Sequence, residues 1–492
     1  MIENLPAIQV VLPLLAAPLC FLIRRPAWVR VFAVAVTWSC FAIALTLFHR
    51  VQTGGIIIYE FGDWPRPLAI EYLIDPLNSF VLVIVTMIAA VTLPIGLGDA
   101  KEQIPPGREY LFYAAFLLCF TGLLGVTITG DAFNIFVFLE IASLSTYILI
   151  SLGKSRRALM AAYSYLIMGT IGATFILIGI GFLYQMTGTL NIFDLAQRLD
   201  EVGQSSTVFV ALAFVMVGIS IKLALFPLHQ WLPNAYSEAP PVVSAFLAAT
   251  ATKVAFYLLL RFTFTIFHAS VVFEVLHLET LLMPLSLMAM FVGSAAAIYQ
   301  TDFKRLLAYS SIAQIGYMGL GMSLNSVAGV TAGVVHLFNH ALMKGGLFLV
   351  AACIVHQIGT SRIRDMAGLG KRMPWTSAAL VIGGLSLIGV PGTVGFVSKW
   401  YLVLAALEQD MLPIAALILL SSLLAGVYVW RLVEVVYFKD RPEGAPAAEE
   451  APLLFLIPTW ILMAGCVYFG LFTDFSLGAA LAAAHELLGV AS

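Results

Sequence analysis

Charged residues are scarce in this chain of 492 residues: Asp, Glu, Lys and Arg make up 11% of it, whereas 61% is hydrophobic. A soluble domain carries roughly 25% charged residues, and a soluble fold could not hide so much apolar surface. The composition therefore excludes a soluble protein and predicts an integral membrane protein. A net charge of −2, without a basic or acidic run, argues against nucleic acid as a partner.

Two classes of motif are missing. No G-x-x-x-x-G-K-[ST] loop is present to cradle a phosphate, so nucleotide-driven transport is not expected. Cysteine is rare as well, and no C-x-x-C pair occurs, which excludes an iron-sulfur cluster or a zinc site of that type. The five cysteines lie in apolar runs and are interpreted as small buried hydrophobes: Cys20, Cys40, Cys119, Cys353 and Cys466. No cofactor is expected, and no catalysis by the chain alone.

Long apolar runs fill the sequence instead. Fourteen of them are long enough to cross a hydrocarbon layer of ~30 Å, and the first is interpreted as a retained helix because no basic segment precedes it and no small-residue cleavage site follows. The runs lie at about 5–23, 31–49, 76–97, 110–129, 132–152, 162–185, 207–228, 241–266, 280–299, 304–323, 327–357, 376–406, 411–437 and 453–472. The sequence thus predicts an all-α polytopic protein with one membrane domain, 1–492.

The distribution of Lys and Arg supports this count, because cytoplasmic connections collect positive charge. Alternate connections hold seventeen such residues: Arg24, Arg25, Arg30, Lys101, Arg108, Lys154, Arg156, Arg157, Lys304, Arg305, Arg362, Arg364, Lys371, Arg372, Arg431, Lys439 and Arg441. The intervening connections hold four: Arg50, Arg66, Arg198 and Arg261. The alternation predicts that both termini lie on the extracytoplasmic side.

Five charged residues fall inside the predicted spans: Glu140, Lys222, Lys253, Lys344 and Lys399. Each costs about 2.5–3.5 kcal/mol at mid-bilayer, so such residues usually serve a function. A lysine that snorkels to the interface is the structural alternative, above all at Lys399. Glu140 lies nine residues into its span and cannot snorkel far, so it should pair with a cation or be protonated.

Three titratable residues share one face of the 327–357 span. His336, His340 and Lys344 follow one another at intervals of four residues, which aligns them over ~12 Å of helix. Imidazole both accepts and donates a proton near neutral pH, so the spacing favours a proton relay over isolated packing residues. Zinc binding by the two histidines is a weaker alternative, because a third ligand would have to come from another helix and Lys344 would repel the metal.

Two spans are interrupted close to a lysine. The seventh carries Lys222 followed by Pro227, and the twelfth carries Pro391 followed by Lys399. Freed backbone carbonyls are tolerated in a membrane where they line a hydrated cavity or are covered by protein. A packing kink is the alternative for either break alone. The spacing predicts two five-helix repeats, spans 4–8 and 9–13, in opposite orientation, which points to an ion pathway at the midplane.

These repeats divide the predicted membrane domain into four units. The predicted units are 1–108 with spans 1–3, 109–267 as the first repeat, 277–438 as the second, and 452–492 with the last span and a C-terminal tail.

Several motifs resemble the antiporter-like subunits shared by Mrp-type Na⁺/H⁺ antiporters, respiratory complex I and membrane-bound hydrogenases. They run in order through the chain: G-D-A-F-N-I-F-V-F-L-E (130–140), K-L-A-L-F-P-L-H-Q-W-L-P-N-A-Y (222–236), A-P-P-V-V-S-A-F-L-A-A-T-A-T-K (239–253), D-F-K-R-L-L-A-Y-S-S-I-A-Q-I-G-Y (302–317), H-L-F-N-H-A-L-M-K-G-G-L-F (336–348) and G-F-V-S-K-W (395–400). The first motif and the chain length look most similar to the D subunit of Mrp antiporters.

The resemblance implies a multi-pass protein of a bacterial or archaeal cell membrane that works with other membrane subunits and transports H⁺ and, in an antiporter, Na⁺. Carried over by position, Glu140 pairs with Lys222 and Lys253 forms a bridge. His336 or His340 continues the pathway with Lys344, and Lys399 is the exit. The resemblance leaves open whether the complex is an Mrp-type antiporter or a redox-driven pump of the complex I or hydrogenase kind. A scaffold without transport is a third possibility, which the full set of buried charges disfavours.

Overall fold

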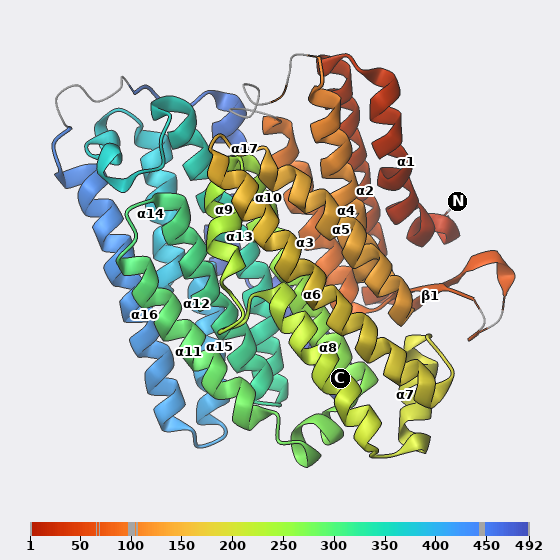
Figure 1. Cartoon of the computed structure of the whole chain (residues 1–492). Coiled ribbons are helices and arrows are strands. Elements are labelled where there is room, and N and C mark those ends of the chain that lie inside the picture. The colour runs from red at the N-terminus through yellow and green to blue at the C-terminus, as the bar shows by residue number, and fades with distance from the viewer. Residues whose placement is uncertain are drawn as a thin grey trace.

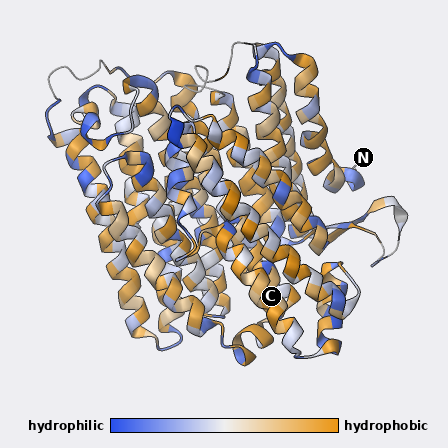
Figure 2. Cartoon of the chain, in the orientation of Figure 1, coloured by the Kyte–Doolittle hydropathy of each residue, from blue (hydrophilic) through white to orange (hydrophobic). Residues whose placement is uncertain are grey.

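The computed structural model describes residues 2–64, 66–67, 69–96, 104, 107–441 and 448–490. Within these ranges the chain forms a bundle of long helices that run roughly along one common direction (Figure 1). Hydrophobic residues cover most of the helix surfaces, and hydrophilic residues gather toward the ends (Figure 2). This arrangement fits a bundle embedded in a lipid bilayer.

The described part of the first half of the chain contains ten α-helices and a β-hairpin. The helices are α1 (Leu5–Ile23), α2 (Pro26–Gly54), α3 (Pro76–Thr92), α4 (Glu109–Ile128), α5 (Ala132–Ser151), α6 (Arg156–Thr187), α7 (Ile192–Val202), α8 (Ser206–Leu223), α9 (Trp231–Glu238) and α10 (Pro241–Leu260). Strands β1 (Ile57–Glu60) and β2 (Glu71–Ile74) pair antiparallel between α2 and α3. Two π-helical segments, η5 (Arg261–Ile266) and η6 (Ser270–Val275), follow α10.

The second half contains the remaining helices. They are α11 (Glu279–Ile298), α12 (Phe303–Ser323), α13 (Val327–Ile358), α14 (Pro374–Ile388), α15 (Val394–Leu407), α16 (Leu412–Val433), α17 (Leu453–Leu471) and α18 (Asp474–Leu488). The π-helical segment η9 (Glu434–Phe438) extends α16, and short 3-10 turns occupy Ile2–Asn4, Phe61–Asp63, Leu93–Ile95, Ile363–Met366 and Leu369–Lys371.

Twelve of the described helices are long and apolar enough to cross a membrane. The other two predicted spans do not meet this criterion, each for a different reason. Helix α12 has 21 residues but carries buried polar side chains such as Ser310, Ser311 and Gln314. Since it packs inside the protein, it does not need an apolar surface. The span predicted at 376–406 is divided into the shorter apolar helices α14 and α15.

Both predicted helix interruptions are present. Helix α8 ends at Leu223, where Ala224 has a left-handed conformation with φ of 60°, and the chain becomes helical again at Trp231. The Trp231 indole donates a hydrogen bond of 2.8 Å to the Ile221 carbonyl, which also accepts one of 3.1 Å from the Ala224 backbone. Helix α14 ends at Ile388 and is followed by Gly389, whose φ of 90° suits glycine because it has no Cβ. Each break therefore has its own means of stopping the helix.

Two equivalent bridges support the predicted inverted repeats. The residue before α5, Asp131, pairs with Asn191, and the residue before α12, Asp302, pairs with Arg362. Each residue of the second bridge follows its counterpart by 171 positions, and α6 and α13 between them both have 32 residues. In Figure 1, α7 after the first bridge lies at the lower right, whereas the turns between α13 and α14 lie at the upper left. The two bridges thus lie at opposite ends of the bundle.

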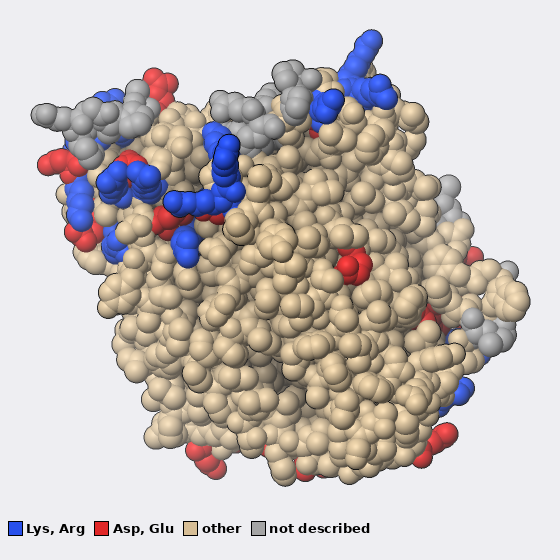
Figure 3. Space-filling view, in the orientation of Figure 1, with Lys and Arg blue, Asp and Glu red and all other residues tan. Residues whose placement is uncertain are grey.

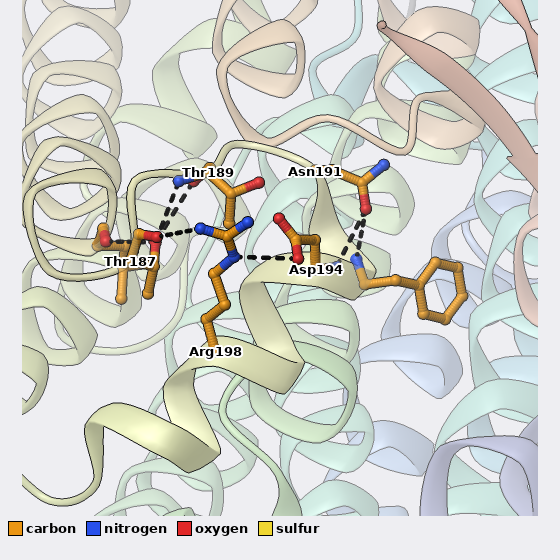
Figure 4. A network of polar contacts seen from close by, with 7 residues as sticks. Thr187, Thr189, Asn191, Asp194 and Arg198 are labelled. Atoms are coloured by element: carbon orange, nitrogen blue, oxygen red, sulfur yellow. Dashed lines mark hydrogen bonds and ion pairs between the residues drawn. The ribbon is translucent and has the colours of Figure 1, made fainter. Parts of the chain in front are cut away.

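A polar network joins α6 to α7 next to the first bridge (Figure 4). Asn191 caps α7 by accepting hydrogen bonds of 3.1 Å from the backbone of Phe193 and of Asp194. Arg198 donates to the Asp194 carboxylate at 3.0 Å and to the Thr187 carbonyl at 2.9 Å. These contacts hold the short helix α7 across the end of α6 and close this end of the first repeat.

Positive charge gathers at one end of the bundle, the upper edge in Figure 3. A cavity of about 240 Å³ there is lined by Lys154 between α5 and α6, Glu238 at the end of α9, Lys304 at the start of α12 and Arg362 between α13 and α14. The hydrogen bond of 2.7 Å from Ser155 to Glu238 also joins the connection between α5 and α6 to the end of α9. Lys154, Lys304 and Arg362, from three of the predicted basic connections, thus lie together, whereas Lys101 lies outside the described residues. The side on which the termini lie and the limits of the four predicted units stay predictions.

The segment after α17 was expected to be a tail, but it forms helix α18, which packs against α3, α13 and η5. Arg261, expected in a connection, is 1% exposed and pairs with Asp75. Asp75 is 186 positions away in the chain and caps the N-terminus of α3. Arg261 is therefore a buried charge, because a carboxylate from a distant segment compensates it.

Candidate functional site

The carboxylate of Glu140 on α5 meets the ammonium of Lys222 in the last turn of α8. The distance from Lys222 Nζ to Glu140 Oε1 is 3.7 Å, and Nζ also donates a hydrogen bond of 2.7 Å to Ser143 Oγ. The Lys222 side chain is 5% exposed, whereas that of Glu140 is 25% exposed. The expected pair is therefore present, with one partner inside the protein and the other close to its surface.

Lys253 lies in the middle of α10 and is completely buried. Its ammonium donates to the Ala248 carbonyl and, at 3.3 Å, to Thr252 Oγ1. No carboxylate pairs with it among the described residues. Lys253 is within electrostatic range of His340 and Lys344 on α13, and its helix α10 packs against both α8 and α13.

The two histidines of α13 stack on each other, with ring centroids 6.0 Å apart and planes inclined by 12°. His336 Nδ1 shares a hydrogen bond of 2.8 Å with Ser398 Oγ of α15, and its Nε2 has no partner among the described residues. Neither ring nitrogen of His340 has a hydrogen-bond partner there either, although both are buried. Unpaired buried polar atoms are costly, so these three nitrogens mark positions where water molecules or a moving proton would fit.

Lys344 lies one further turn along α13 and is completely buried. Its ammonium donates to the Leu307 carbonyl at 2.8 Å and to the Ser310 hydroxyl, both on α12. The predicted alignment of His336, His340 and Lys344 on one face is thus present. In the part of the chain that the structure describes, no group of three His, Cys, Asp or Glu side chains could hold a metal ion.

Lys399 lies in the second turn of α15, just after the break. Its ammonium donates to the Leu387 and Ile388 carbonyls at 2.8 and 2.9 Å, and lies 4.6 Å from the centre of the Tyr317 ring. The lysine therefore satisfies carbonyls that the end of α14 leaves free. Lys222, in contrast, precedes the break of its own helix, so the two lysines are not at equivalent positions of the two repeats.

The structure brings the seven predicted residues into one buried region that crosses the bundle from α5 to α15. Glu140 is the acidic member at one end, and Lys399 is the basic member at the other. His336 is within electrostatic range of both Lys253 and Lys399. Such a row of ionisable groups, separated by hydroxyls and unpaired imidazole nitrogens, can pass protons without a cofactor.

Sequence reasoning missed the hydroxyl partners of this row, namely Ser143, Ser310, Tyr317 and Ser398. Serine and tyrosine are common in apolar helices, so nothing in their type distinguishes them. Ser143 follows Glu140 by three positions and Ser398 precedes Lys399 directly. For these two serines, proximity in the sequence to a charged residue within a span was the usable signal.

Comparison with known proteins places the chain in a family. The model for "NADH:quinone oxidoreductase/Mrp antiporter, TM" matches residues 129–425. The N subunit of the NADH-quinone oxidoreductase of Desulforudis audaxviator is 40% identical, with 96% of this chain and 97% of the relative covered. The D subunit of the Na⁺/H⁺ antiporter of Alkalihalophilus pseudofirmus is 30% identical, with 95% and 94% covered.

Solved structures share the fold. A chain of the Mrp complex from Dietzia sp. DQ12-45-1b has a TM-score of 0.91 at 24% identity, with 99% of this chain and 97% of that chain covered. A chain of the membrane-bound sulfane sulfur reductase, an archaeal respiratory membrane complex, has a TM-score of 0.89 at 29% identity, with 99% and 98% covered. The matches extend over the whole bundle. The chain is a multi-pass membrane protein of the NADH:quinone oxidoreductase/Mrp antiporter transmembrane family.

Proposed function

We propose that this chain is the proton-translocating subunit of a multisubunit Mrp-type cation (Na⁺)/proton antiporter in a bacterial or archaeal cell membrane. The observation that carries this proposal is the buried row of ionisable side chains from Glu140 and Lys222 through Lys253, His340 and His336 to Lys399. A protein without transport has little reason to bury so many charges at mid-depth.

The Glu140–Lys222 pair is the switch in the proposed mechanism. A nearby carboxylate favours the charged form of a buried lysine, so movement of Glu140 away from Lys222 removes that support and promotes release of the proton. Lys253 is the next base along the row. Protons then pass by way of Lys344 and the α13 histidines to Lys399, where the break between α14 and α15 gives access to one side of the membrane.

Partners are proposed from the surface around Glu140. Leu144 and Ile148, one and two turns further along α5, are 53% and 54% exposed. A partly exposed carboxylate within such an apolar face is unfavourable against lipid tails. This supports a neighbouring membrane subunit that covers α5 and influences the position of Glu140.

A second candidate is the equivalent pumping subunit of a redox complex of the complex I or hydrogenase kind. The observation that favours it is the 40% identity to an NADH-quinone oxidoreductase subunit, against 30% to a Na⁺/H⁺ antiporter subunit. Both candidates use the same buried row. They differ in the energy source, which the neighbouring subunits supply.

Purification of the intact complex through a tag on this chain, followed by mass spectrometry of its partners, separates the two candidates. We expect a set of membrane subunits alone. Co-purified subunits with iron-sulfur, nickel or flavin groups would instead establish the redox candidate. A chain that purifies without partners and moves no protons in vesicles would contradict both.

A further inference from the structure

A second group of charged residues lies outside the row, where the start of α3, the end of α10 and α18 meet: Asp75 and Arg261 are buried and Glu486 is half-buried. Asp75 and Arg261 are 0% and 1% exposed, and they form an ion pair through Arg261 Nη2 and Asp75 Oδ2. The other Asp75 oxygen accepts a hydrogen bond of 2.9 Å from the Asn78 backbone. Arg261 also donates to Tyr257 OH at 3.4 Å and to Thr265 Oγ1 at 3.3 Å.

Glu486 of α18 is the third charged member of this group. Its carboxyl group interacts electrostatically with the Asp75 carboxyl group and with Arg261, near the Leu77 backbone at the start of α3. Glu486 Oε2 is buried and has no donor among the described residues. Ionised carboxylates only accept hydrogen bonds, so Asp75 and Glu486 can bond to each other only when one of them carries a proton.

The group is connected to the main row through one face of α10. Lys253, Tyr257 and Arg261 follow one another at intervals of four residues, which aligns them over about 12 Å along the helix. The Tyr257 ring also lies against the Arg261 guanidinium, with 5.3 Å between the ring centre and Cζ. A hydroxyl group therefore lies between the central lysine and the carboxyl pair.

We propose that Asp75 and Glu486 form a proton-binding site, positioned by Arg261 and reached from Lys253 past Tyr257, through which the subunit exchanges protons at this end of the bundle. The proposal rests on the proposed function, to which it adds a branch through α18. Arg261 is a positioning residue, because a guanidinium keeps its protons in proteins. The proton binds to the carboxyl pair, from which Tyr257 can relay it.

The surroundings of Glu486 suit this role. Burial and the adjacent Asp75 carboxylate raise the pKa of Glu486 to about 8, whereas Arg261 opposes this shift. Of the elements packed on α18, α3 contributes Asp75 and η5 contributes Arg261. No charged group of α13 takes part among the described residues. The carboxyl group therefore holds a proton at neutral pH and releases it when the pH rises above about 8.

The first test detects the protonated form of the Glu486 carboxyl group. Dicyclohexylcarbodiimide reacts with protonated carboxyl groups in apolar surroundings, and peptide mass spectrometry of the intact complex locates the adduct. We expect modification of Glu486 at pH 7 that falls as the pH rises through about 8, with Glu201 at the exposed end of α7 as the control carboxyl. Absence of modification at Glu486 at pH 7 would overturn the proposal.

The second test measures transport by the assembled complex in vesicles with a pH-sensitive dye. We expect Glu486→Gln to slow proton movement about tenfold or more, Glu486→Asp to restore part of the rate, and Glu201→Gln to have no effect. A wild-type rate in Glu486→Gln would show that the group only anchors α18. If Glu486→Gln fails to assemble, Tyr257→Phe takes its place, with a loss of rate expected and a wild-type rate overturning the branch.

Different results would contradict the proposed function and the proposed carboxyl site. Modification of Glu486 does not require transport, so it should persist in Glu140→Gln. Wild-type transport in Glu140→Gln would remove the proposed pathway while leaving the carboxyl site in place. If Glu486 is not modified but Glu140→Gln still slows transport, only the proposed branch is contradicted.

Discussion

Lys222 Nζ lies 3.7 Å from Glu140 Oε1, and the two side chains differ in their surroundings: that of Lys222 is 5% exposed and that of Glu140 is 25% exposed. The pair thus joins the protein interior to the apolar outer face of α5. A change at that face can move the Glu140 side chain and leave the lysine in place, because the buried Ser143 of α5 also accepts a hydrogen bond of 2.7 Å from the ammonium. This asymmetry suits the pair to respond to a neighbouring subunit that contacts the outer face of α5.

Glu140→Ala or Lys222→Ala should abolish proton-coupled transport and leave the complex assembled. Removing one partner of this half-buried ion pair leaves the other charge uncompensated and removes the proposed switch. Dye-detected proton movement in vesicles measures the loss, and the amount of co-purified partner subunits checks assembly. Glu201→Gln on exposed α7 is the matched control. Wild-type transport in either alanine variant would exclude the pair from the mechanism.

Substitutions of Lys399 distinguish a proton relay from a purely structural lysine. The structural role is a real alternative because Lys399 donates to the Leu387 and Ile388 carbonyls. Lys399→Arg should be inactive, since guanidinium donates more hydrogen bonds but is not deprotonated in proteins. Lys399→Glu should retain part of the rate, because a carboxyl group also exchanges protons. An active arginine variant together with an inactive glutamate variant would show that the lysine is structural and that the pathway leaves elsewhere.

Gly395→Ala should destabilise the break between α14 and α15. A Cβ at this position would lie 1.7 Å from the Ser386 carbonyl oxygen, so the two helices would have to separate. We expect a loss of about 1–3 kcal/mol, as for other overpacked sites, seen as a lower midpoint of thermal unfolding in detergent. Gly426→Ala on α16 is the matched control, because no described atom lies within 4 Å of its added Cβ. Equal midpoints in the two variants would contradict this packing.

The isolated chain should transport few or no ions. Its partly exposed Glu140 needs a covering neighbour, and without one the proposed switch has nothing to move it. Liposomes that contain the purified subunit alone should show at least about a tenfold lower rate of Na⁺/H⁺ exchange than liposomes with the whole complex, equivalent to about 1.4 kcal/mol in the barrier. Exchange by the single subunit at the rate of the complex would refute this dependence.

Much of the fold could be predicted because the relevant signals are local. An apolar run of about 20 residues is sufficient to identify a spanning helix, and the alternation of Lys and Arg distinguishes the two ends of the bundle. The buried charges Glu140, Lys222 and Lys253 were visible for the same reason, since each interrupts an apolar run. The two breaks were also predictable, because proline and glycine commonly end helices.

The tertiary structure alone decided which side chains meet. Arg261 fits a connection by sequence alone, and only the fold places Asp75, distant in the chain, beside it. Glu486 belongs to a segment without a predicted span, and its neighbours come from α3 and η5. Likewise, the partner of His336 is Ser398, 62 positions away. Hydropathy reports the free energy of each segment in the bilayer, whereas these contacts depend on how helices pack, and helix packing is settled by shape and hydrogen bonding between segments that are remote in the chain.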